Sequence, residues 1–362
     1  MRNLFVLGLL ILALFALVVG CDREVNYISE DGGDGYGDYT NNEECMTCHN
    51  GLLLQAKGEW QNSIHASGNT IDYTNRGGSD CTQCHSHQGF LDYLATGEVN
   101  APYDNVSAIH CFTCHAPHER GDLSLRTMEP VTLANGVVFD HNEGNLCANC
   151  HRSRVDVGTL VDGFTVTSTH WGPHHGPQGD LLAATGGYEF AGYNYGNSAH
   201  AVAAAKACAT CHMGNPTQHD GYGVGGHSFN IQDEEGNSIS GVCSSCHNDA
   251  NKIDFDADAD YDHDGEIEGY QTEMVGLADS LAVLLYNAGA LSAVEDGHPV
   301  TGTYADGDLV GALYNYIYFE EDRSEGIHNF RYMQGLLQSS IDYLNSATVS
   351  GNGNTPTIAK AH

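Results

Sequence analysis

The distribution of apolar residues divides the chain into three unequal parts. Residues 4–19 form an almost uninterrupted apolar run, whereas residues 44–250 show no sustained helical or alternating period. In the C-terminal third, leucine and isoleucine recur at helical spacing. They are Leu277, Leu281, Leu284 and Leu285 within residues 271–288, and Leu336, Leu337, Ile341 and Leu344 within residues 331–346. This spacing predicts two amphipathic helices.

A third helix is predicted around residues 307–319, where tyrosine and phenylalanine are concentrated. Aromatic residues in such a helix pack against neighbouring helices. We therefore expect residues 251–349 to form a helical cap and residues 350–362 to form a flexible tail. Because the chain has 44 glycines, the remainder is predicted to consist of short helices joined by extensive irregular coil. The fold class expected is mainly α.

The motif Cys-x-x-Cys-His occurs six times and uses every cysteine of the chain but one. Numbered as motifs 1 to 6 in chain order, the copies are Cys45-Cys48-His49, Cys81-Cys84-His85, Cys111-Cys114-His115, Cys147-Cys150-His151, Cys208-Cys211-His212 and Cys243-Cys246-His247. In such a motif the thiols bind a c-type haem and the histidine ligates its iron. Zinc sites and a disulfide framework are the alternatives, but neither requires a histidine after every second cysteine. We expect six covalent haems c with proximal motif histidines.

The ratio of haems to residues constrains the fold of residues 44–250, the predicted hexahaem domain. Without its first 20 residues the chain has 342 residues, about 57 for each of six haems. Haem rings are therefore expected to supply much of the buried apolar surface, and the chain without haem is expected to fold poorly. The first cysteines of motifs 1 to 4 are 36, 30 and 36 residues apart, which suggests a repeated haem unit.

The N-terminal residues are typical of a lipoprotein signal peptide. Arg2 precedes the apolar run, and Val18, Val19 and Gly20 precede Cys21. Cleavage after residue 20 would leave Cys21 to carry a lipid. An uncleaved anchor is the alternative, but this run has 16 residues, whereas about 20 are needed to span a bilayer. We expect residues 1–20 to be removed, residues 21–43 to form a lipid anchor and flexible tether, and the protein to be exported.

The charge of the chain excludes one class of partner. The sequence has 13 basic and 47 acidic residues, a net charge of −34. Nucleic acid is excluded, because binding phosphates requires a basic surface. The acidity favours solubility. The alternative, attraction of a cationic redox partner or of metal cations, stays open.

The number of histidines indicates which residues bind the second axial position of each haem iron. Six of the 21 histidines belong to the motifs, which leaves 15 for six distal positions. All six haems are therefore expected to be bis-histidine, as suits electron transfer. Met128, Met274 and Met333 lie outside the signal and motif regions, and we expect none of them to bind iron.

Six histidines are candidates for the distal positions: His65, His118, His174, His200, His227 and His328. His227 follows two glycines, which let the backbone come close to a haem face. His328 is placed at the start of the last predicted helix. His174 is chosen over its neighbours His170 and His175. The alternates are His87, His110, His141 and His298, and no role is expected for His219, His263 and His362.

The acidic segment at residues 260–268 matches the beginning of a calcium loop. Its candidate ligands are Asp260, Asp262, Asp264, Glu266 and Glu268, and a glycine at the sixth position permits the sharp turn. The twelfth position is Gln271 instead of glutamate, so Glu268 or Glu273 is expected to substitute. The alternative is a solvated acidic linker before the first cap helix.

Several segments together resemble a family of exported multihaem cytochrome c lipoproteins. These are the six motifs, residues 171–178, residues 225–229, the acidic loop and residues 326–329. Such proteins occur in anaerobic bacteria that respire metals or other external acceptors, and they are distantly similar to cytochrome c nitrite reductases. The resemblance implies a haem array with a helical cap. It also implies distal histidines from later segments, which supports His200, His227 and His328.

Three functions are compatible with these features. We expect an electron carrier or conduit, not an enzyme, that acts in anaerobic or extracellular respiration. Its partners would be other redox proteins or extracellular acceptors, and it would lie on the periplasmic or cell-surface face of a membrane, the outer membrane being favoured. One alternative is a reductase of nitrite, hydroxylamine or a sulfur oxyanion with one open haem. The other is a subunit of an extracellular cytochrome filament, which a lipid on Cys21 disfavours.

Intact-mass spectrometry tests the motif assignment. The holoprotein is expected to exceed its lipid-free polypeptide by six haem masses, because the six motifs leave no other role for their cysteines. A Cys21→Ser variant should keep all of these haems but leave the membrane fraction. Bound zinc or a smaller number of haems would contradict the assignment, and membrane retention of Cys21→Ser would contradict the lipid anchor.

Overall fold

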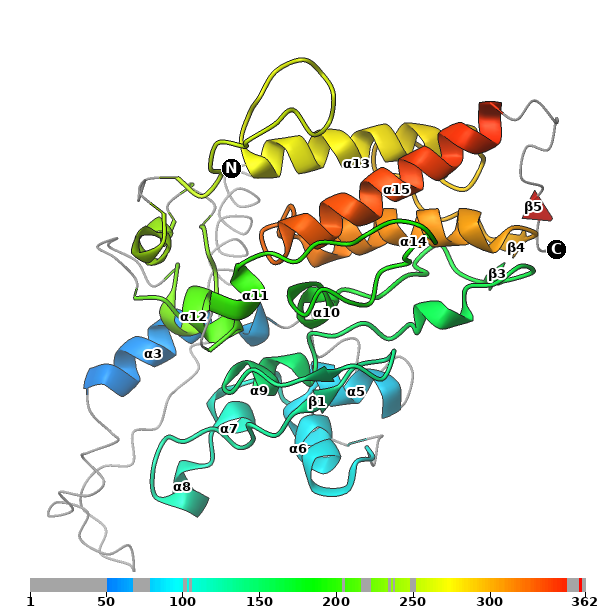
Figure 1. Cartoon of the computed structure of the whole chain (residues 1–362). Helices are drawn as coiled ribbons and strands as arrows, with labels where there is room; N and C mark the ends of the chain where they lie inside the picture. Colours follow the sequence, from blue (N-terminus) through cyan, green and yellow to red (C-terminus); the bar gives the residue numbers. More distant parts are fainter. Residues whose placement is uncertain are drawn as a thin grey trace, which may run out of the picture. The chain divides into compact units, whose positions relative to one another are not determined.

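The computed structural model describes most of the chain from residue 51 onward. The described residues are 51–67, 79–99, 103, 106–203, 206–215, 223–233, 236, 238–247, 252–349 and 358–359. They all belong to one unit that extends from Cys48 to His362. Helices and irregular coil make up most of this unit, and its strands are short (Figure 1). The expectation of a mainly helical fold with extensive coil is confirmed.

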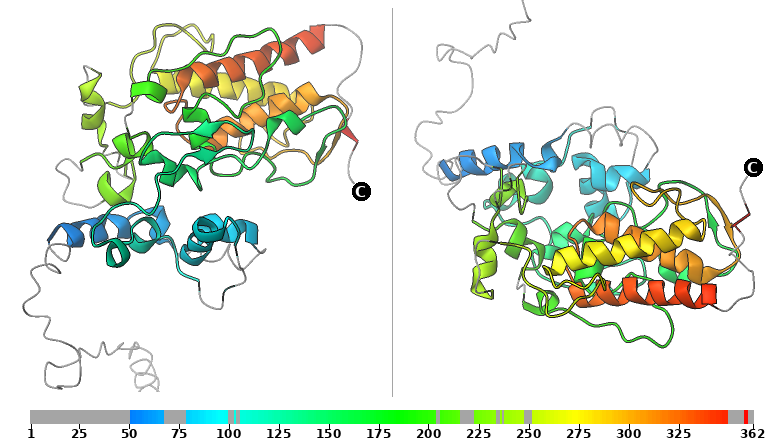
Figure 2. Two further views of the ribbon diagram at one scale, coloured as in Figure 1. Left: turned by 60° about the horizontal axis from the view of Figure 1, so that its bottom comes forward. Right: turned by 90° about the horizontal axis from the view of Figure 1, so that it is seen from above.

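The three longest helices lie in the predicted cap. They are α13 (Tyr270–Asn287), α14 (Gly307–Asp322) and α15 (Phe330–Val349), and all three pack side by side in both views of Figure 2. Each corresponds to one of the helices predicted from the sequence. The Asp306 side chain accepts a hydrogen bond from the backbone N–H of Asp308 at the start of α14, which satisfies a helical donor that has no partner within the helix.

Helix α14 is the centre of the hydrophobic core. Its side chains are buried on all sides, from Leu309 to Phe319, because α13, α15 and earlier segments surround it. The buried amide of α14, Asn315, is held by hydrogen bonds to the backbone N–H and carbonyl of Tyr188 (2.8 and 2.9 Å) and to the Ser340 hydroxyl (3.0 Å). A buried polar group is costly unless it is bonded in this way, so Asn315 fixes how the Tyr188 segment docks.

Segments that precede the cap in sequence complete this core. Leu160, Val166, Leu181 and Phe190 belong to the same buried cluster as the cap helices. Strands β3 (Thr165–Val166), β4 (Gly302–Tyr304) and β5 (Ile358–Ala359) form an antiparallel sheet, in which Thr165 is paired with Thr303 and Thr303 with Ala359. The core of the cap therefore also recruits residues from the predicted haem domain.

The remaining elements are short. They are α3 (Gly51–Gln61), η2 (Ile64–Ala66), α5 (Ser79–His85), α6 (His87–Thr96), α7 (Cys111–Cys114), α8 (Pro117–Arg120), β1 (Val131–Thr132), β2 (Val138–Phe139), α9 (Gly144–Ala148), η3 (Val157–Thr159), α10 (Gln178–Leu182), α11 (His200–Ala203), α12 (Cys208–His212), η4 (Gly226–Ser228) and η5 (Ser240–Ser245), where η denotes a 3-10 helix. Strands β1 and β2 form a hairpin with Val131 opposite Phe139. A second, much smaller apolar cluster lies around this hairpin and α9.

Within the described ranges, no helix combines the length and the apolar character needed to cross a bilayer. The predicted apolar run at residues 4–19 lies outside those ranges.

The core position of α13 predicts a stability difference between two similar substitutions. Leu281→Ala should lower the free energy of unfolding by about 2–5 kcal/mol, because Leu281 is fully buried and its removal leaves a cavity. Val283 lies on the same helix and is 44% exposed. Val283→Ala should therefore lower the free energy of unfolding far less. Urea unfolding followed by far-UV circular dichroism measures both. Equal losses would contradict the packing described for α13.

Candidate haem-binding sites

Five of the six motifs lie in the described part of the chain, and a short helix carries each of them. Motif 2 lies in α5, motif 3 begins in α7, motif 4 begins in α9, motif 5 lies in α12 and motif 6 begins in η5. A helical turn brings residues three apart to the same side of the helix, as attachment of both thiols to one haem requires. Motif 1, with Cys45, Cys48 and His49, lies outside the described residues.

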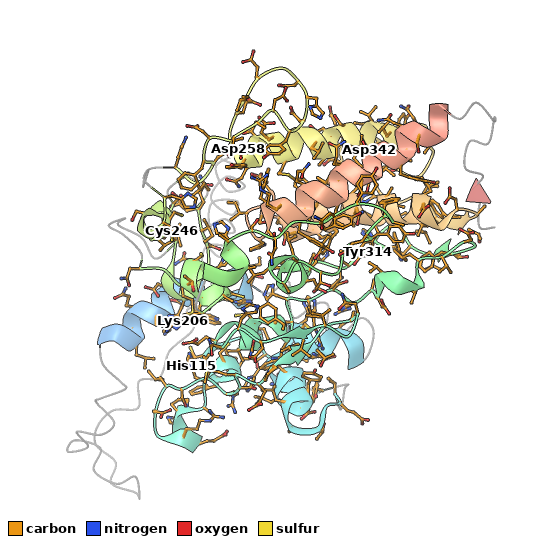
Figure 3. The ribbon with its side chains drawn as sticks, in the orientation of Figure 1. His115, Lys206, Cys246, Asp258, Tyr314 and Asp342 are labelled. Carbon is orange, nitrogen blue, oxygen red and sulfur yellow. The ribbon has the colours of Figure 1, made fainter. Side chains whose placement is uncertain are left out.

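Each of the five described motif histidines faces a histidine from a distant segment. The ring centroids are 6.1 Å apart for His85 and His174, 6.4 Å for His115 and His227, 6.1 Å for His151 and His65, 6.1 Å for His212 and His328, and 6.1 Å for His247 and His200. The partners are five of the six distal candidates. His115 is labelled in Figure 3, in the part of the molecule that carries the short motif helices.

This separation fits one metal ion between two imidazoles. A bond between a metal and an imidazole nitrogen is about 2 Å long, and the nitrogen lies about 1 Å from the ring centre, so two rings on opposite sides of one ion have centroids about 6 Å apart. Direct ring contact would bring them closer, as in the tilted pair His87 and His110 at 4.3 Å. The five facing pairs and their cysteines are therefore a donor set that fits bis-histidine haem c.

Hydrogen bonds orient several of these imidazoles through the Nδ1 atom. Nδ1 of His151 is 3.1 Å from the side-chain oxygen of Gln178, Nδ1 of His212 is 2.8 Å from the carbonyl oxygen of Phe229, and Nδ1 of His200 is 2.7 Å from the carbonyl oxygen of Ile327. An oxygen acceptor holds the ring proton on Nδ1 and leaves the Nε2 lone pair free to bind a metal. These neighbours fix both the tautomer and the direction of the ring.

At two other histidines, the oxygen next to Nδ1 belongs to a carboxylate. Nδ1 of His328 is 2.8 Å from Oδ1 of Asp322, and Nδ1 of His227 is 3.4 Å from Oε2 of Glu59. Glu59 also accepts a hydrogen bond from the backbone N–H of His227 at 2.9 Å. Gly226 has a φ of +53°, and a Cβ at this position would lie 2.3 Å from the Glu59 carboxylate. Glycine is therefore required for the turn that presents His227.

Burial favours the neutral form, which binds metal, in five of these ten imidazoles. It lowers the pKa of His65 and of His174 to about 4, with smaller contributions from nearby cationic groups. Burial also lowers the pKa of His85, His151 and His212. His328 differs, because burial acts in the same direction but the Asp322 carboxylate outweighs it and raises the pKa.

Cysteines of different motifs lie next to each other. The thiols of Cys84 in motif 2 and Cys150 in motif 4 are within hydrogen-bonding distance, as are those of Cys147 in motif 4 and Cys208 in motif 5. Cys211 of motif 5 is close enough to both cysteines of motif 6 to interact with them electrostatically. Motifs 2, 4, 5 and 6 are therefore successive neighbours in a row. Cys114 of motif 3 interacts electrostatically with Cys147 and Cys150, so motif 3 lies beside motif 4.

One residue, Phe229, contacts three of the facing pairs. Its ring centroid is 5.1 Å from that of His65 and 6.1 Å from that of His227, and its carbonyl oxygen accepts from His212. The sequence analysis did not assign a role to Phe229, Gln178 or Asp322. The signals for them in the sequence are their proximity to candidate ligands, within six residues of His227, His174 and His328 respectively, and, for Phe229 and Gln178, their place in segments that carry the family resemblance.

The structure separates His174 from its neighbour His175. His174 has a φ of +69° and faces His85, whereas Nδ1 of His175 lies 2.5 Å from Oε2 of Glu321. His328 lies just before α15, which begins at Phe330, so its predicted position at the start of that helix is two residues early. His118 has a ring contact with Phe112 at 5.7 Å and is the one distal candidate that no described motif histidine faces.

The other histidines occupy different surroundings. His170 has a ring contact with His298, and His141 with Phe139. Nδ1 of His87 is 3.0 Å from the Thr113 hydroxyl. His219 and His362 lie outside the described residues.

The acidic loop brings carboxylates together in two overlapping groups. One consists of Asp260, Asp262 and Glu273, and the other of Asp262, Asp264 and Glu268, with ligand atoms within 4.8 Å of each other in each group. Glu266 is in neither. The buried Glu273 carboxylate accepts hydrogen bonds from the backbone N–H groups of Tyr261 (2.6 Å) and Glu268 (2.9 Å), so it ties the loop to the first turn of α13. Burial and the surrounding carboxylates raise the pKa of Asp262.

Three known cytochromes resemble this chain. The C-type polyheme cytochrome OmcC of Geobacter sulfurreducens is 25% identical over 143 residues, which are 32% of this chain and 18% of OmcC. The structure of the outer cell wall cytochrome OcwA superposes with a TM-score of 0.49 at 19% identity, covering 80% of this chain and 50% of OcwA. The structure of an undecaheme cytochrome from the S-layer of Carboxydothermus ferrireducens superposes with a TM-score of 0.42 at 19% identity, covering 83% of this chain and 41% of that cytochrome. No family model matches.

The chain thus spans less than a fifth of OmcC and half of OcwA. The motifs are those of a multihaem c-type cytochrome, and the partial sequence match to OmcC supports this class. The more distant likeness to cytochrome c nitrite reductases stays a prediction.

Proposed function

We propose that this protein transfers electrons through six covalent haems whose irons are closed by histidine on both faces. The observation that carries this proposal is the set of five facing histidine pairs, each at 6.1–6.4 Å between ring centroids. A haem iron held by two imidazoles changes oxidation state with little change in geometry and offers no position to a substrate. The residues of the chain bind and orient the groups.

The row of adjacent cysteines supports a conduit. Thiols within hydrogen-bonding distance join motif 2 to motif 4 and motif 4 to motif 5. Groups attached at neighbouring motifs would therefore have their attachment edges close together. Phe229, which touches His65 and His227 and bonds His212, lies where the ligand sets of motifs 3, 4 and 5 meet. The arrangement favours passage of electrons along the row over storage at isolated sites.

In the cell, we propose that the protein is exported and held at a membrane by a lipid on Cys21. Its acidic charge of −34 suits a soluble protein outside the cytoplasm and a cationic redox partner. Donors and acceptors would be other redox proteins or extracellular electron acceptors in anaerobic respiration. A reductase is less favoured, because a substrate would have to displace one of two facing imidazoles at every described motif.

Adjacent histidines provide a matched test of the ligand set. His174→Ala should convert one of the haems to high spin and let it bind cyanide, because His174 faces His85. His175→Ala should leave every haem low-spin, since His175 is directed toward Glu321. Electron paramagnetic resonance and visible absorption of the oxidised holoproteins distinguish the two results.

The same spectra examine the function itself. Wild-type protein is expected to be wholly low-spin and unchanged by added cyanide or nitrite. High-spin iron or nitrite binding in the wild type would instead favour a reductase. A high-spin haem in His175→Ala, with none in His174→Ala, would overturn the pairing.

We also propose that the acidic loop binds calcium through Asp260, Asp262 and Glu273, with Asp264 and Glu268 next to them. Calcium prefers several carboxylate oxygens, and neutralising them would stabilise the contact between the loop and α13. Adding a calcium chelator should therefore lower the Tm of the cap, measured by circular dichroism. An Asp260→Asn variant should respond less to the chelator than the wild type. An unchanged Tm in the wild type would remove calcium from the proposal.

A further inference from the structure

The carboxyl end of α14 places a buried negative charge beside one of the facing pairs. Asp322 is the last residue of α14 and is 3% exposed. Its Oδ1 lies 2.8 Å from Nδ1 of His328, and its Oδ2 accepts hydrogen bonds from the hydroxyl and the backbone N–H of Ser324. An acidic residue at this end of a helix is unfavourable, because the helix dipole is also negative there. The bonds from His328 and Ser324 offset this cost.

Three other imidazoles of the facing pairs are bonded to neutral oxygens. Gln178 supplies a side-chain amide oxygen to His151, and backbone carbonyls of Phe229 and Ile327 accept from His212 and His200. Glu59 is charged, but its Oε2 is 3.4 Å from Nδ1 of His227 and closer, at 2.9 Å, to the backbone N–H of the same residue. The bond between His328 and Asp322 is therefore the stronger of the two contacts between a ring and a carboxylate.

A carboxylate acceptor makes an imidazole a better electron donor to a metal than a neutral acceptor does. A negative charge close to an iron also favours its more positive oxidation state, and the effect is larger in a buried site where water does not screen it. The carboxyl end of α14 adds partial negative charge in the same place. All three effects stabilise the oxidised state.

We propose that Asp322 is a positioning residue that lowers the reduction potential of the haem at motif 5. This inference rests on the proposed function, in which His212 and His328 close that iron. Motif 5 lies between motifs 4 and 6 in the row of cysteines. A lowered potential in the middle of the row makes an electron pass an uphill step between its two parts, so Asp322 controls the exchange of electrons between them.

Redox titration of the holoprotein tests the proposal. Asp322→Asn should raise one midpoint potential and keep every haem low-spin, because asparagine preserves the size and an oxygen acceptor but removes the charge. Glu321→Gln is the matched control. It removes the same charge one residue away, where the carboxylate bonds to His175 and interacts with His174. Any shift it causes should therefore be smaller and should affect the motif 2 haem, not the motif 5 haem.

A second variant shifts the potential in the opposite direction. Ser324→Ala removes the hydroxyl donor to Oδ2 of Asp322 and leaves the carboxylate more strongly negative toward His328. It also removes the acceptor of the His328 backbone N–H, so a low-spin spectrum of the variant must first show that His328 keeps its place. One midpoint potential should fall. If Asp322→Asn does not fold, this milder substitution still tests whether the charge of Asp322 affects the potential of the motif 5 haem.

The outcomes separate this inference from the ligand assignment. Unchanged potentials in low-spin Asp322→Asn, or equal shifts in Asp322→Asn and Glu321→Gln, would overturn the role of Asp322 and leave the ligands as proposed. His328→Ala should produce one high-spin haem. If it keeps the wild-type spectrum, the assignment of His328 is wrong, and the proposed function fails at motif 5 independently of Asp322.

Discussion

The described haem region depends on pairs of imidazoles that face each other from distant segments of the chain. His65 meets His151 and His212 meets His328, so each pair joins parts of the chain that local structure leaves apart. This region has only a small apolar cluster around the β1–β2 hairpin and α9. Bonds from iron and the buried faces of haem would therefore replace the apolar core that so few residues cannot build.

The cap supplies the conventional core and connects it to the histidine pairs. Helix α14 is buried along its length, and its carboxyl end lies beside two of the pairs. Gln178 makes this link, because its Nε2 donates to the backbone carbonyl of Glu321 at 3.1 Å while its Oε1 lies 3.1 Å from Nδ1 of His151. Asp322 makes a second link, to His328. The position of one rigid helix thus determines the direction and the charge environment of both ligand sets.

The hydrogen-bond acceptors on Nδ1 divide the pairs chemically. Backbone carbonyls at His212 and His200 are neutral and come from segments that are themselves fixed by packing, so they orient the ring at little electrostatic cost. The carboxylate at His328 both orients the imidazole ring and polarises it. Where two haems have the same type of axial ligand, such hydrogen-bond neighbours are one means, together with burial and nearby charge, of giving them different potentials.

Local patterns in the sequence determined the attachment motifs, the three cap helices and the pool of histidines, since each depends on residues a few positions apart. Five of the six chosen distal candidates face a motif histidine, but only the tertiary structure decided which motif histidine each candidate faces. It also decided between His174 and His175, because the ring of His174 faces His85 whereas Nδ1 of His175 is bonded to Glu321. Asp322, Gln178 and Phe229 acquire their roles through contacts formed in the folded chain. Spacing along a sequence records periodicity within one element, whereas the distance between two elements is set by how their surfaces pack.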